Sequence, residues 1–312
     1  MSLRDVILLL SVCIVLGLNL VVTRWVVADA GVPPILFAGL RFLGVAIVLF
    51  WCLRPLPKNL GMLFLIAMGM GAVNFALMFT GLVYAEASAV AVVAQLGVPM
   101  MTIMGVIFLG EKIGWRRGAG ILLAFAGSFM IAFNPATFSF SLGLILVVLA
   151  VLASSSAGIL MKKMPPIGAL QMQAWIALFS FLPLLLVSGL FEGDQNGLDT
   201  VLSGGWMVWS ALAFAILLVS VFAQAGFYYL LKTYEVSLIN PLMIMAPIWS
   251  VILGVLILDE TLTLQLLIGA AISLGGVFVI LIRPGTPPPD ASLSGNMAGA
   301  PPKKDKSPPA LK

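Results

Sequence analysis

One arginine lies inside an apolar stretch of the chain, where an ionisable side chain is costly and therefore points to a function. Arg41 follows Pro33 by eight residues, which places it about 12 Å along a helix that begins near that proline. Its planar guanidinium is suited to anchor a carboxylate through paired hydrogen bonds. The alternative role is structural: Arg41 would hold backbone carbonyl groups or pair with an acid such as Glu86. The sequence alone leaves both roles open.

Amide, aromatic and thioether side chains inside other apolar stretches are further candidates for contact with a small molecule. Pockets are mostly apolar with a few polar groups that orient the ligand, whereas amides within membranes also bond neighbouring helices. Trp175 lies well inside its stretch and either stacks on a ligand or packs against neighbours. The complete set of candidate substrate-binding residues is Asn19, Arg41, Asn74, Met78, Gln95, Gln173, Trp175, Gln224, Phe227, Tyr228 and Asn240.

Two prolines interrupt apolar stretches near their middle. Pro99 and Pro247 each remove a backbone hydrogen bond and permit a kink. They are candidates for hinges or gates, and the alternative is that they serve helix packing alone. Two stripes of small residues predict close packing with a helix of the same chain or of a second copy; they are Gly120, Ala124, Gly127 and Gly269, Ser273, Gly276.

The composition excludes several classes of protein. Of the 312 residues, 62% are hydrophobic and 9% are charged, whereas about a quarter of the residues of a soluble domain are charged. The chain has no histidine, and Cys13 and Cys52 both lie in apolar stretches, so a zinc site or a Ser/His hydrolase lacks its usual parts. We expect no catalytic residues, no metal, no cofactor and no enzymatic activity.

These candidates must be positioned by membrane-spanning helices. A run of about 20 apolar residues crosses a bilayer as a helix, and helices satisfy their own backbone groups in lipid. A secretory signal is a poor explanation of the first run, because that run is longer than the apolar region of such signals. We predict an all-α integral membrane protein with ten transmembrane helices near residues 4–26, 33–54, 60–83, 87–109, 115–134, 141–161, 167–190, 206–231, 236–257 and 263–283.

Basic residues indicate how these helices are oriented, because short cytoplasmic loops collect Lys and Arg. Fourteen of the 16 basic residues fall on one side of the predicted membrane. Both termini are therefore predicted to be cytoplasmic, and the net charge of +4 reflects this orientation rather than nucleic-acid binding. Residues 284–312 are rich in proline and lysine and predict a disordered cytoplasmic tail.

The chain also contains an internal repeat. Glu111 and Glu260, Gly120 and Gly269, and Gly127 and Gly276 are pairs that share an offset of 149 residues. The repeats are predicted to span residues 1–134 and 135–283, and because each has five helices the second must enter the membrane inverted. Inverted repeats are typical of secondary transporters. We expect the two glutamates to lie at water-accessible helix ends, in salt bridges or bonds to helix-end groups rather than in proton coupling.

The five-plus-five pattern, the GLRFLG segment around Arg41 and the paired "Glu, eight residues, Gly, six residues, Gly" endings resemble the EamA family of the drug/metabolite transporter superfamily. The resemblance covers roughly residues 5–283. It implies a central cavity between the halves, with the fifth and tenth helices at the periphery, and extends to bacterial exporters of aromatic and other amino acids. One departure is Trp175, which stands near the position that corresponds to Arg41.

We therefore expect a secondary transporter of the bacterial inner membrane that exports amino acids by alternating access through a central cavity. Alternatives are an exporter of other drugs or metabolites, and a membrane scaffold that transports nothing. The expected partners are a small-molecule substrate and the lipid bilayer, without nucleic acid. The sequence leaves open the exact substrate, the coupling ion, the direction of net flux and the oligomeric state.

Overall fold

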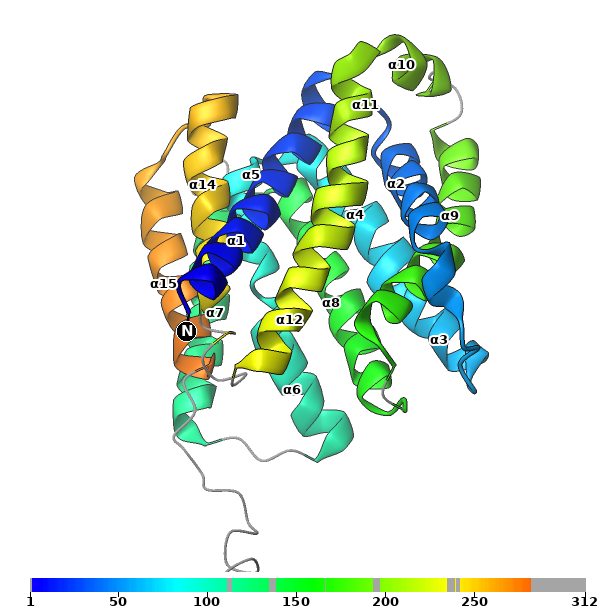
Figure 1. The fold of residues 1–312 in the computed structure, drawn as a ribbon. Coiled ribbons are helices and arrows are strands. Elements are labelled where there is room, and N and C mark those ends of the chain that lie inside the picture. Colours follow the sequence, from blue (N-terminus) through cyan, green and yellow to red (C-terminus); the bar gives the residue numbers. More distant parts are fainter. Residues whose placement is uncertain are drawn as a thin grey trace, which may run out of the picture. The chain divides into compact units, whose positions relative to one another are not determined.

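The computed structural model describes residues 2–110, 114–134, 139–165, 167–192, 197–234, 239 and 242–281 (Figure 1). Three of the residues singled out above, Glu111, Asn240 and the side chain of Tyr228, lie outside this description, as does the predicted tail 284–312. The described residues therefore make up the helical core of the chain.

Within the described residues, seven helices are long and apolar enough to cross a membrane, so the chain is a multi-pass membrane protein. Four of them are divided into consecutive segments. The seven comprise α1 with η1 (Leu3–Arg24, Trp25–Asp29), α3 with η3 and α4 (Leu60–Ala67, Met68–Val73, Asn74–Tyr84), α5 with α6 (Ala87–Ala94, Gly97–Leu109), α8 (Leu142–Lys162), α9 (Ala169–Phe191), α11 with η5 and α12 (Gly205–Ala213, Phe214–Ala223, Gln224–Thr233), and α15 (Leu264–Leu281).

Other elements complete this core. Two apolar helices are shorter, α2 (Pro34–Val48) and α14 (Met245–Leu258), and α7 (Trp115–Ala132) carries two arginines in its first turn. The all-helical prediction misses one detail, since β1 (Phe133–Asn134) and β2 (Ser139–Phe140) form a short antiparallel pair. The remaining helical pieces are η2 (Phe50–Leu53) and α10 (Gly197–Ser203).

Helices α7 and α15 lie side by side at one edge of the helices (Figure 1). A Cβ atom at Gly120 would lie 2.7 Å from the carbonyl oxygen of Gly276, and a Cβ at Gly127 would lie 2.5 Å from that of Gly269. The hydroxyls of Ser128 and Ser273 are hydrogen-bonded at 3.1 Å. The small-residue stripes therefore pack against each other within one chain, and the two helices run antiparallel.

Three membrane-spanning helices contain wide π-helical turns or breaks at their centre. Segments η3 and η5 are π-helical. Helix α5 ends at Ala94, and α6 begins three residues later, at Gly97, with Pro99 as its third residue. Pro247 likewise is the third residue of α14. Pro99 therefore coincides with a real interruption of its helix, and both prolines stand in a first turn, where a missing backbone N–H is tolerated.

We use the term linker end for the end of the bundle that holds residues 82–87, 130–133, 140–144 and 259–266. These residues come from the ends of α4 and α7 and the beginnings of α5, α8 and α15. Several of these residues line one common cavity, described below. The opposite end holds the start of α1 and the end of α6 (Figure 1).

Candidate functional site

Arg41 is the best-defined polar group in the middle of the described helices. It lies on α2, which begins with Pro34 at its first turn and receives a carboxylate at its N-terminus: Glu192 accepts hydrogen bonds from the backbone N–H groups of Ile35 at 2.9 Å and Leu36 at 3.0 Å. Negative charge at a helix N-terminus is stabilising. The side chain of Arg41 is 4% exposed and is therefore buried among the helices.

The neighbours of Arg41 are neutral. Its Nε and Nη2 groups donate to the hydroxyl of Ser220 at 3.3 and 3.2 Å, and Nη1 donates to Oδ1 of Asn19 at 3.3 Å. The guanidinium carbon lies 5.1 Å from the centre of the Phe75 ring, within the range of a cation–π contact. Among the described residues, none of its partners is a carboxylate or a backbone carbonyl, so both structural pairings considered above, including that with Glu86, are absent there.

Ser220 is held in place by the local backbone. Its hydroxyl donates to the carbonyl oxygen of Ala215 at 2.9 Å, five residues earlier, within the π-helical segment η5. Wide turns of this kind are frequent at functional sites. The sequence analysis missed Ser220 and Phe75, although Ser220 precedes the candidate Gln224 by four residues and so shares its helix face.

A guanidinium has five N–H donors, and three hydrogen bonds to two neutral acceptors leave it short of partners. A buried charge without an opposite charge is costly. The arrangement around Arg41 can therefore accept an anionic group with a gain in electrostatic energy. Carboxylates fit this requirement, because a guanidinium can hold both of their oxygens at once.

The other candidates are dispersed over the helices. Asn74 donates from Nδ2 to the carbonyl oxygen of Ala150 at 2.8 Å and thereby joins α4 to α8, which is the helix-bonding role. Met78 packs against the main hydrophobic core, and Phe227 packs against the cluster around Leu9 and Cys13. The side chains of Gln95, Gln173 and Gln224 are each half-buried.

Trp175 does not join the Arg41 cluster. It packs against Leu63, Ile66 and Met164, and its ring centre lies 5.4 Å from that of Phe179. Leu185 lies against Gly39 on α2, so Trp175, ten residues earlier on α9, is displaced by about 15 Å along that helix. Its indole N–H is buried without a hydrogen-bond partner among the described residues, which leaves packing as its observed role.

Glu260 occupies a site that the sequence analysis described only in part. Its carboxylate accepts hydrogen bonds from the backbone N–H groups of Ala87 at 2.6 Å and Ser88 at 3.0 Å and from the Ser88 hydroxyl. The predicted bonds to helix-end groups are confirmed, but the predicted access to water is wrong, because Glu260 is 9% exposed. Gly254 makes room for it, since a Cβ there would lie 2.4 Å from Oε2.

Metal binding finds no support in the described part of the chain, where no three Cys, Asp or Glu side chains are grouped to hold an ion. The cluster that remains is thus organic in character: one guanidinium, one amide, one hydroxyl and aromatic rings. Groups of this kind orient ligands in largely apolar pockets.

Comparison with known proteins agrees with this reading. The sequence profile of the EamA-like transporter family matches residues 3–133 and 141–282. A protein of Salmonella typhimurium named "Probable amino-acid metabolite efflux pump" is 28% identical over 289 residues, which cover 89% of this chain and 95% of the relative. An Escherichia coli protein of the same name is 27% identical, with coverage of 89% and 95%. A solved structure with a TM-score of 0.56 and 19% identity covers 86% of this chain and 95% of its own, and shows that the fold is shared.

Proposed function

We propose that this protein exports amino acids, including aromatic ones, across the bacterial inner membrane. The chain belongs to the EamA-like transporter family, and the relatives named above are transporters and not enzymes. The observation that carries this proposal is the buried guanidinium of Arg41. Among the described residues, all of its hydrogen-bond partners are neutral. The carboxylate of the solute supplies the missing anion. The names of the two efflux pumps point to the same class of solute.

The energetics favour a reversible anchor. Both partners of Arg41 are neutral acceptors, whereas a carboxylate adds an opposite charge and can accept two parallel hydrogen bonds, so a carboxylate gains more from the guanidinium than Asn19 and Ser220 do. The solute must also leave, which requires that the empty site remain stable. Ser220 and Asn19 provide for this by holding the guanidinium when no solute is bound.

Aromatic rings beside Arg41 suit an apolar solute side chain. The ring centre of Phe75 lies 4.8 Å from that of Phe42 and 5.3 Å from that of Phe79, in edge-on arrangements. Met78 is half-buried one helical turn beyond Asn74. Phe42 and Phe79 are themselves buried, at 2% and 1% exposure, so the half-buried Phe75 is the ring of this group that an aromatic solute would contact.

We further propose ten membrane crossings in two inverted repeats, residues 1–134 and 135–283, with both termini cytoplasmic. The seven long helices together with α2, α7 and α14 make the ten. Three observations support the repeat. The two family matches fall in separate halves, and η3 shifted by 149 residues becomes 217–222, inside η5. In addition, Gly120 lies against Gly276, the counterpart of Gly127, and Gly127 lies against Gly269, the counterpart of Gly120.

Alternating access follows from this architecture. Inverted repeats can exchange conformations and expose one midplane site to each side in turn. Pro99 stands at the interruption between α5 and α6, and Pro247 holds the matching place in α14. We assign these prolines as hinges, because a helix that lacks a continuous hydrogen-bond ladder bends there at low cost.

The proposal is tested by counterflow in proteoliposomes that contain the full chain. Labelled phenylalanine, alanine and glutamate are compared with a sugar phosphate and an organic cation, with and without a pH gradient. We expect uptake of amino acids that saturates and is strongest for phenylalanine. Absence of flux for every amino acid, from protein that is folded by circular dichroism, would remove amino acids as the substrate class.

A further inference from the structure

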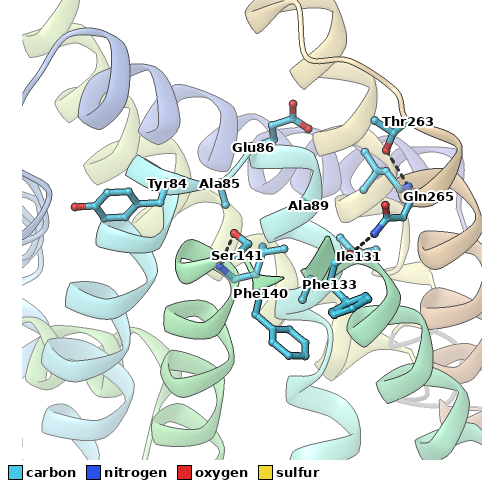
Figure 2. A pocket seen from close by; sticks show the side chains of 13 residues that line it. Tyr84, Ala85, Glu86, Ala89, Ile131, Phe133, Phe140, Ser141, Thr263 and Gln265 are labelled. Carbon is cyan, nitrogen blue, oxygen red and sulfur yellow. Dashed lines mark hydrogen bonds between the residues drawn. The ribbon is translucent and has the colours of Figure 1, made fainter. Parts of the chain in front are cut away.

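A cavity lies at the linker end, and Arg41 is not among its lining residues. It has a volume of about 390 Å³, in the range of sites that hold small molecules. Its wall includes Glu86, Ser141, Thr263 and Gln265. Figure 2 shows Glu86 on the side of α5 and Thr263 with Gln265 on the side of α15, so the polar groups come from different helices.

The helix N-termini around this cavity already have partners. The carboxylate of Glu260 accepts from the first N–H groups of α5. Ser141 accepts from the backbone N–H of Leu144 at 3.5 Å at the start of α8, and Thr263 accepts from that of Leu266 at 3.1 Å at the start of α15. Several of the backbone donors at these helix starts are therefore already bonded.

The helix C-termini are satisfied as well. Arg24 donates from Nη1 to the carbonyl oxygens of Leu82 at 2.7 Å and Val83 at 3.1 Å, at the end of α4. The amide nitrogen of Gln265 donates to the carbonyl oxygens of Met130 at 2.5 Å and Phe133 at 2.6 Å, at the end of α7. The side-chain oxygen of Gln265 is left over, since both amide hydrogens are engaged.

Glu86 is the second acceptor that remains. It is half-buried, and no described residue donates a hydrogen bond to its carboxylate. Burial raises the pKa of Glu86, the nearby carboxylate of Glu260 raises the pKa further, and Arg24 opposes both effects only in part. The cavity thus offers acceptors and an incompletely compensated negative charge.

We propose that this cavity binds a primary ammonium group. A protonated amine supplies three donors and a positive charge, which match the free oxygens of Glu86 and Gln265. The site adjoins an apolar groove lined by Phe129, Leu264 and Ile268, and both hollows share Phe133 and Gln265. The ligand is therefore an amine with an apolar part, either a small solute or a lipid with an ethanolamine headgroup.

Calorimetric titration of the full chain in phosphatidylglycerol nanodiscs tests the assignment, with phenethylamine as the probe and 2-phenylethanol as its uncharged analogue. We expect phenethylamine to bind at least tenfold more tightly than the alcohol. Glu86→Gln should weaken phenethylamine binding by about tenfold, and Glu86→Asp should retain most of it. Equal affinity in wild type and Glu86→Gln would overturn the proposal.

Two control variants separate this site from its surroundings and from Arg41. Asp29→Asn removes an exposed carboxylate outside the cavity lining and should leave the affinity unchanged. Arg41→Lys should also leave it unchanged, whereas a loss with that variant and none with Glu86→Gln would place the amine at the central site and contradict the proposal.

Nanodiscs made with phosphatidylethanolamine distinguish the two sources of the amine. Weaker apparent binding of phenethylamine there identifies the lipid headgroup as a competing ligand. Unchanged binding identifies a small solute amine as the ligand. Both outcomes keep the ammonium assignment, which the Glu86 variants decide.

Discussion

The two polar regions of this transporter are opposite in charge. Around Arg41 a guanidinium lies buried among neutral groups, whereas at the linker end the carboxylate of Glu86 lies half-buried without a described donor. No described carboxylate is bonded to Arg41, and at the linker end Arg24 offsets the charge of Glu86 only in part. An amino acid bears both a carboxylate and an ammonium group, so the proposed anchor at Arg41 and the proposed amine site at the linker end correspond to its two charged ends.

The largest effect is expected at Arg41. Arg41→Gln removes the anchor, and truncating one partner of a buried charge pair costs about 2–5 kcal/mol, so the apparent affinity for phenylalanine should fall by about 100-fold. Counterflow at increasing substrate concentration measures this fall. The thermal unfolding temperature of the variant should stay close to that of wild type, because the residue removed has no described ionic partner. A large drop in that temperature would assign Arg41 to the support of the fold.

Glu260 provides the structural contrast to Glu86. Glu260→Gln weakens three hydrogen bonds at the start of α5, so we expect a loss of about 1–3 kcal/mol in stability. Glu86→Gln, with no described bond to lose, serves as the matched control and should change stability little. Thermal unfolding of both variants in the same detergent compares them, and equal losses would show that the two carboxylates do not differ in role.

The contact of α7 with α15 tests the packing on which both regions depend. In Gly127→Ala the new Cβ would lie 2.4 Å from a backbone nitrogen and 2.5 Å from a carbonyl oxygen of α15, so the helices must separate at a cost of about 1–3 kcal/mol. Gly118→Ala is the control on the same helix, since nothing lies within 4 Å of its Cβ position. The thermal unfolding temperature should fall in Gly127→Ala and stay unchanged in Gly118→Ala.

A pH titration sharpens the comparison further. The pKa of Glu86 is raised in the folded chain, so its carboxyl takes up a proton at a higher pH than an ordinary glutamate does. Binding of phenethylamine should be full at neutral pH and fall as the pH is lowered through this raised pKa. Glu86→Gln should flatten the profile, and a profile that keeps its shape in that variant would assign the titration to another group.

The smallest effect is expected at Asn74. Its amide bonds α4 to α8 through Ala150, and bonds of this kind between membrane helices contribute about 0.6 kcal/mol. Asn74→Ala should therefore lower stability slightly and leave the affinity for phenylalanine unchanged. A tenfold loss of affinity in counterflow would instead return Asn74 to the substrate site.

The sequence predicted those features that depend on local pattern. Apolar length located the long helices, and the spacing of small residues predicted a smooth face on α7 and on α15, although the sequence left open whether these faces meet within one chain. The depth of Arg41 followed from its distance to Pro33. Each of these rests on helix geometry, which is a property of neighbouring residues.

Features that depend on contacts between distant helices could not be predicted. Ser220 became a partner of Arg41 only because η5 packs beside α2. Trp175 lies deep in its helix, yet depth does not say which neighbour it meets, and its neighbours are Leu63 and Ile66. Glu260 looked water-accessible because it follows the end of a helix, but the loop folds it against α5.

The most direct test of the central claim, that Arg41 holds the solute carboxylate, is competition of labelled phenylalanine counterflow by unlabelled phenylalanine and by phenylalanine amide, which lacks the carboxylate. In wild type, phenylalanine should compete at least tenfold better than the amide, and in Arg41→Gln this difference should disappear. Equal competition by the two compounds in wild type would contradict the assignment of Arg41 as the anchor.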